Sequence, residues 1–120
     1  MRNTLFAAAA LNLSVAPAFL PAAQGVRELA GLPRGEDPLY LSTIGMFVLI
    51  FGLGYLWSAA SGRVDRIFIG VAAMGKLSVV ALLLGFWALG SLPARAALTG
   101  IPDLIFGLLF VRWLWRVAGP

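Results

Sequence analysis

The apolar stretch from Ile67 to Gly90 constrains this chain more than any other feature. At about 1.5 Å per residue it is long enough to cross a hydrocarbon core of about 30 Å, and its one charged residue is Lys76. A cationic side chain at membrane depth costs about 2.5 to 3.5 kcal/mol on insertion scales. The ammonium must therefore face the protein interior, find a partner or reach the interface. The stretch predicts a membrane helix bundle with a polar interior.

The composition agrees with a membrane protein of one domain, residues 1–120. Hydrophobic residues make up 61% of the chain and charged residues 12%, and the mean hydropathy is +0.94. The net charge of +4 comes from nine Lys and Arg residues scattered at the ends of apolar runs. This pattern favours anionic lipid and topology signals over nucleic-acid binding.

Four apolar runs predict an all-α, up-down four-helix bundle in the membrane. The predicted spans cover about residues 4–23, 41–60, 67–90 and 96–117, and a polar loop over 24–40 lies outside the cytoplasm. Pro17 and Pro21 predict that the first helix kinks near Pro17 or ends before Pro21. Because Ala16-Pro17-Ala18 has a small-x-small pattern, a cleaved signal peptide is the alternative for this run.

The polar loop contains a short pattern of apolar residues. Val26, Leu29 and Leu32 recur at helical spacing, which predicts one or two turns lying on the membrane surface. A plain solvated loop is the alternative.

Basic residues and tryptophans indicate orientation and depth. Five arginines fall on one side of the predicted bundle and three on the other, which favours both termini in the cytoplasm. The five are Arg2, Arg63, Arg66, Arg112 and Arg116, and the three are Arg27, Arg34 and Arg95. The predicted interface anchors are Trp57, Trp87, Trp113, Trp115, Arg112 and Arg116.

A candidate polar centre follows from the depth of the polar residues in their spans. Helix rise places Lys76 and Asp103 within roughly 6 Å of each other in depth, and their spans are neighbours through a short turn. Asn12 and Tyr55 fall in a similar layer and could complete a hydrogen-bonded cluster. Three interpretations stay open: a static polar group that fixes helix register, a site for a proton, ion or small ligand, or a lysine that snorkels without a partner.

Small residues predict where the helices approach one another closely. The second span carries Gly45, Gly52, Gly54 and Ser58, and in the fourth span Gly100 and Gly107 share a face with Asp103.

Catalytic and redox chemistry has little support in the sequence. The chain contains no cysteine and no histidine, so thiolate nucleophiles, disulfides and the usual haem, zinc and copper ligands are excluded. No second intramembrane carboxylate accompanies Asp103 to hold a metal. We expect no catalytic residue, no metal and no cofactor.

Several motifs resemble a known group of proteins. They are GLGYLWSAASGRVDR (Gly52 to Arg66), GVAAMGKL (Gly70 to Leu77), the turn with Pro93, and PDLIFGLLF (Pro102 to Phe110). Together these resemble small four-span bacterial membrane proteins of no established activity that are loosely DoxX-like. The resemblance implies a four-helix fold in the bacterial inner membrane, and some relatives are thought to accompany redox enzymes.

Two functions are expected from these features. The first is a non-enzymatic accessory or assembly subunit of a larger membrane complex, with the lipid bilayer and a membrane protein or a second copy as partners. The second is a small carrier or binding protein whose Lys76 and Asp103 hold an anionic, quinone-like or lipid ligand.

Overall fold

The computed structural model describes residues 1–33 and 37–118, and every regular element in these ranges is helical. The predicted all-α class is confirmed for this part of the chain. Residues 34–36 of the predicted polar loop, including Arg34 from the orientation count, lie outside the described residues, as do 119–120.

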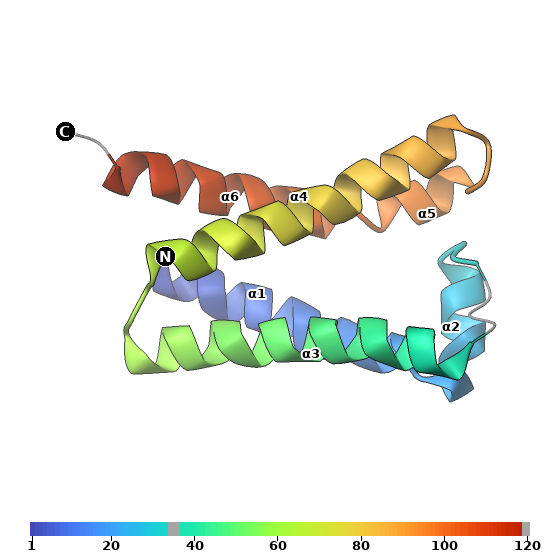
Figure 1. The fold of residues 1–120 in the computed structure, drawn as a ribbon, viewed down its shortest axis with the longest axis horizontal. Helices are drawn as coiled ribbons and strands as arrows, with labels where there is room; N and C mark the ends of the chain where they lie inside the picture. The colour runs from blue at the N-terminus through green and yellow to red at the C-terminus, as the bar shows by residue number, and fades with distance from the viewer. Residues whose placement is uncertain (34–36, 119–120) are drawn as a thin grey trace.

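Four long helices form two layers, with α1 beside α3 in one layer and α4 beside α6 in the other (Figure 1). The start of α1, the α3–α4 loop and the end of α6 lie at one end of the molecule, which we call the Met1 end; α2 and α5 lie at the opposite end. The long helices are α1 (Arg2–Val15), α3 (Pro38–Ser61), α4 (Arg66–Ala88) and α6 (Ile101–Val117). The short elements are η1 (Ala16–Phe19), η2 (Pro21–Ala23), α2 (Gln24–Leu29) and α5 (Ala94–Leu98).

Three helical segments, Pro38–Ser61, Arg66–Ala88 and Ala94–Val117, are long and apolar enough to cross a membrane. The first predicted span is not one helix, because Arg2–Phe19 and Pro21–Leu29 meet at a bend of 92°. Of the two predicted outcomes, the structure shows the end before Pro21, because the bend lies at Leu20 and not near Pro17. Proline lacks the N–H that a continuing helix needs, so α1 gives way to 3₁₀ turns, and Leu20 between them is extended.

The loop between α3 and α4 is short because both helix ends are capped locally. Asp65 is the N-cap of α4, and its carboxylate accepts a hydrogen bond of 2.9 Å from the Phe68 backbone N–H. Gly62 ends α3 with a φ of 71°, a left-handed conformation that glycine adopts without strain. With these two caps α4 begins at Arg66, shortly after α3 ends at Ser61.

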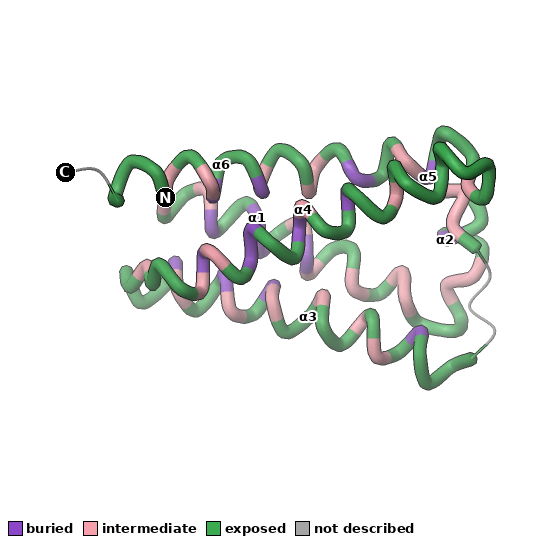
Figure 2. The backbone as a smooth tube through the Cα atoms, turned by 45° about the horizontal axis from the view of Figure 1, so that its top comes forward, coloured by how far each residue is buried: buried purple, intermediate pink, exposed green. Residues whose placement is uncertain are grey.

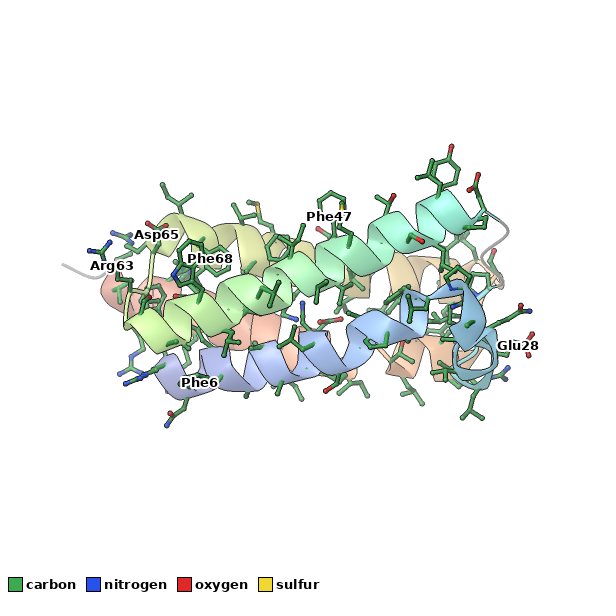
Figure 3. All side chains as sticks on the ribbon, turned by 90° about the horizontal axis from the view of Figure 1, so that it is seen from below. Phe6, Glu28, Phe47, Arg63, Asp65 and Phe68 are labelled. Carbon is green, nitrogen blue, oxygen red and sulfur yellow. The ribbon has the colours of Figure 1, made fainter. Side chains whose placement is uncertain are left out.

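The surface of the bundle is apolar, and its interior contains many small side chains. Buried positions lie among exposed and half-buried ones along each long helix (Figure 2). Phe47 on α3 is 54% exposed and points away from the other helices (Figure 3). The buried cluster includes Ala8, Ala72 and Tyr55 and lies toward the Met1 end. An apolar exterior over a small-residue interior is the arrangement expected of helices that pack in lipid.

Candidate functional site

The structure brings Lys76 of α4 and Asp103 of α6 together. The Lys76 Nζ donates to Asp103 Oδ1 over 2.7 Å, a length typical of a charge-assisted hydrogen bond. The two partners differ in burial, because the lysine side chain is 6% exposed and the aspartate side chain 28%. The pair is therefore a buried cation beside a carboxylate that is open on one side.

Asn12 extends this pair into the other layer. The Lys76 Nζ donates to Asn12 Oδ1 over 3.2 Å, and Asn12 Nδ2 donates to the Val48 carbonyl of α3 over 3.1 Å. One amide group thus connects α1, α3 and α4, and the ion pair adds α6. The polar centre touches all four long helices.

Tyr55 contributes its aromatic ring to the polar centre. The Lys76 Nζ lies 5.6 Å from the centroid of the Tyr55 ring and 5.6 Å from that of Phe106. These distances fall within the range of cation–π attraction. The hydrogen-bonded cluster expected from the sequence therefore contains Asn12, Lys76 and Asp103, with the rings of Tyr55 and Phe106 packed against the ammonium.

Two glycines let the helices around the polar centre approach closely. A Cβ added at Gly107 of α6 would lie 2.8 Å from Leu77 Cδ2 and 3.6 Å from Lys76 Cβ on α4. A Cβ added at Gly52 of α3 would lie 3.0 Å from Asn12 Cβ on α1. A larger side chain at either position would separate the helices that carry the polar groups.

The other predicted packing residues also make contacts within the chain. A Cβ at Gly45, Gly54 or Gly100 would lie 3.0 Å from Phe19, Phe68 or Leu83, respectively. The Ser58 hydroxyl donates to the Arg63 carbonyl.

The predicted interface anchors divide into two groups. Trp57, Trp87 and Trp115 are exposed, as are Arg112 and Arg116. Trp113 differs, because it is half-buried and packs against the core cluster.

Sequence reasoning placed Arg27 in the polar loop and missed its role in the fold. It is 3% exposed, while its neighbours Val26 and Leu29 on the short helix α2 point outward. The Arg27 Nη1 donates to the carbonyls of Ala18 and Leu20 over 2.8 and 2.6 Å. The bend of 92° interrupts the helical hydrogen bonding of this segment. The guanidinium donates to the Ala18 carbonyl and adds a second donor to the Leu20 carbonyl, which also accepts from the Ala23 N–H over 2.9 Å. An arginine following two prolines is the sequence signal that could have indicated this contact.

The polar centre can hold charge and fix register, and its geometry is closed around the ammonium. Two of the three N–H donors of Lys76 have oxygen acceptors, and two aromatic rings lie against the charged group. Among the described residues, no cluster of three Asp or Glu side chains is placed to hold a metal ion.

Comparison of the chain with protein families, curated proteins and solved structures finds no match. The DoxX-like resemblance therefore remains a prediction from the sequence motifs.

Proposed function

We propose that this chain is a non-enzymatic integral protein of the bacterial cytoplasmic membrane that docks as an accessory or assembly subunit against a larger membrane protein. The observation that carries the proposal is the outer face of α4, where a Cβ added at Gly75 or Gly85 would meet none of the described residues within 4 Å. The resemblance to DoxX-like proteins is consistent with such a role.

The outer face of α4 consists of Gly75, Ser78 and Gly85 with two exposed apolar residues, Val71 and Leu82. At 100° per residue these positions lie on one side of the helix, roughly opposite Lys76 and the other buried positions. Across residues 1–33 and 37–118, nothing lies within 4 Å of a Cβ added at Gly75 or Gly85. A Cβ added at any packing glycine of α3 or α6 would instead contact a side chain of a neighbouring element.

A face of this kind suits a transmembrane helix of another protein. Apolar contact alone gives little drive for association in lipid, so helices associate where small residues permit close backbone approach. The polar centre is a weaker candidate for a ligand site, because two of the three Lys76 donors and the Asn12 amide already have partners within it.

We place the fourth membrane crossing in α1 together with η1. Fourteen α-helical residues at about 1.5 Å and four 3₁₀ residues at about 2.0 Å give about 29 Å, close to a core thickness of about 30 Å. The bend at Leu20 then falls at the interface, and α2 lies at the membrane surface opposite the Met1 end.

We assign the Met1 end to the cytoplasm because the charge distribution favours it. Arginines at positions 2, 63, 66, 112 and 116 belong to this end, and Asp65 is its acidic residue among the described ones. The chain lacks cysteine, so Ser61→Cys and Ser91→Cys each introduce one label site. An impermeant thiol reagent added to intact cells should label Ser91→Cys only; labelling of Ser61→Cys instead would reverse the assignment.

The docking proposal is tested by native mass spectrometry of the chain gently extracted from its own membrane. We expect a membrane protein partner in fixed stoichiometry, and the double variant Gly75→Leu, Gly85→Leu should retain about tenfold less of it, a loss of about 1.4 kcal/mol. Ala10→Leu is the matched control, because Ala10 is also an exposed small residue, on α1.

Three outcomes contradict the docking proposal. Equal loss of partner in the control variant would remove the special role of α4. A homodimer without another protein would make the partner a second copy. A bound small molecule that Lys76→Met releases without unfolding the chain would favour the carrier function.

A further inference from the structure

A groove of 960 Å³ lies between α3 and α4 at the Met1 end, on a different part of the molecule from the polar centre. Its walls are mainly apolar and include Leu53, Trp57 and Val71. Its polar end is formed by Arg63 and Asp65 of the α3–α4 loop, and Phe68 of α4 lies close to them (Figure 3). The groove therefore combines a long apolar surface with one charged end.

A pair of aromatic rings contributes to the groove lining. Phe51 and Phe68 are stacked with centroids 6.2 Å apart and an angle of 12° between the rings. Phe68 lies against Gly54, where an added Cβ would be 3.0 Å from its Cζ. The missing side chain at Gly54 thus allows the rings to lie close to α3, and they present a broad apolar surface.

The polar end holds a guanidinium on a fixed piece of backbone. The Arg63 carbonyl accepts the hydroxyl hydrogen bond of Ser58, and the Arg63 backbone N–H donates to the Ser61 Oγ over 3.4 Å. The side chain is exposed, and in residues 1–33 and 37–118 no ion pair involves it. Asp65, which also lines the groove, directs one carboxylate oxygen to its cap on α4.

Depth and charge indicate what kind of anion the groove accepts. Trp57 is 78% exposed beside it, as expected for an aromatic residue at the membrane–water boundary. Arginines also occur elsewhere at the Met1 end, at positions 2, 66, 112 and 116. Basic side chains between membrane helices bind anionic lipid headgroups. A phospholipid combines such a headgroup with acyl chains that match the apolar wall.

We propose that the α3–α4 groove binds one anionic phospholipid, with its phosphate on Arg63 and an acyl chain along Leu53, Phe68 and Val71. This site is separate from the outer face of α4 that the docking proposal uses, since the two share Val71 alone and Gly75, Ser78 and Gly85 do not line the groove.

The test measures lipid retained by the full chain in nanodiscs of equimolar phosphatidylglycerol and phosphatidylcholine, by native mass spectrometry after release. Wild type should keep one phosphatidylglycerol in preference to phosphatidylcholine. Arg63→Gln should lower this retention about fivefold, since a basic residue near an anionic surface contributes about 1 kcal/mol. Arg116→Gln removes the same charge at the same end outside the groove and should change retention less than twofold.

A second variant tests the apolar wall without changing charge. Val71→Trp places a bulky ring in the groove and should also lower phosphatidylglycerol retention, while an unchanged helical melting curve shows that the fold persists. Equal retention of both lipids, or equal losses in Arg63→Gln and Arg116→Gln, would overturn the proposal. Displacement of the bound lipid by inorganic phosphate alone would also overturn it, because the acyl contacts would then contribute nothing.

Discussion

The unequal burial of Lys76 and Asp103 predicts that the two single variants of the pair differ in stability. In Asp103→Asn the Lys76 ammonium loses its counter-ion. The lysine side chain is only 6% exposed and lies against two aromatic rings. An uncompensated charge at this depth should cost about 3 kcal/mol. Lys76→Met leaves instead a carboxylate that is 28% exposed, so water reaches part of it. We expect that variant to lose about 1 to 2 kcal/mol.

The double variant Lys76→Met, Asp103→Asn should be more stable than Asp103→Asn alone. It removes both charges and keeps the hydrogen bond from Asn12 to the Val48 carbonyl. We expect a loss of about 1 kcal/mol relative to wild type, since a polar contact between membrane helices contributes about 0.6 kcal/mol on average.

The assay is unfolding by a denaturing detergent titrated into mild micelles, followed by the fluorescence of the four tryptophans. Ser78→Ala serves as the control, because Ser78 lies on the exposed side of the same helix. If both single variants match the double variant, the ion pair contributes nothing. If Lys76→Met is the less stable single variant, the argument from burial is wrong.

Two further predictions concern packing and the bend. Gly107→Val should destabilise the bundle by about 1 to 3 kcal/mol, because even its Cβ would overlap Leu77. The control Gly85→Val adds a side chain in open space and should change stability by less than about 0.5 kcal/mol. The same detergent titration measures both variants. A larger loss in Gly85→Val would contradict the packing argument. Arg27→Met should speed amide hydrogen exchange over residues 16–29 about tenfold, because the Ala18 and Leu20 carbonyls lose the guanidinium and Leu20 keeps only the Ala23 N–H as donor. Exchange in α4 should stay unchanged, as should exchange over 16–29 in the control Arg112→Met. Unaltered exchange over 16–29 in Arg27→Met would show that the guanidinium does not hold the bend.

The proximity of Lys76 and Asp103 could be predicted because it depends on quantities that sequence determines well. Helix rise sets the depth of each residue, and the short turn between the two spans makes their helices neighbours. Asn12 was placed in the correct layer by the same reasoning. Its bond to the Val48 carbonyl was not predictable, because it requires knowing which face of α1 lies on α3.

Other features depend on rotamers and on three-dimensional packing that a single sequence does not encode locally. The Tyr55 ring meets the ammonium where a hydroxyl contact was expected. Arg27 is buried because the bend directs two carbonyls toward it, and no periodicity within the loop indicates that contact. Glycine spacing indicated that another helix approaches closely at Gly52 and Gly107. It did not indicate whether that helix belongs to this chain or to a partner.

The position of the polar centre explains why a membrane bundle would retain a buried charge. Within each layer, glycines already allow close packing, of α1 on α3 at Gly52 and of α4 on α6 at Gly107. Between the layers, aromatic contacts such as that of Tyr55 with Phe110 lie in the core cluster toward the Met1 end. In lipid these apolar contacts discriminate little between sliding positions of one layer on the other. The bond from Lys76 to Asn12 forms in one register only, because a displacement of one helical turn would move the ammonium about 5.4 Å from its acceptor. We therefore propose that the charge specifies the alignment of the layers, a role that does not require a large stabilising energy.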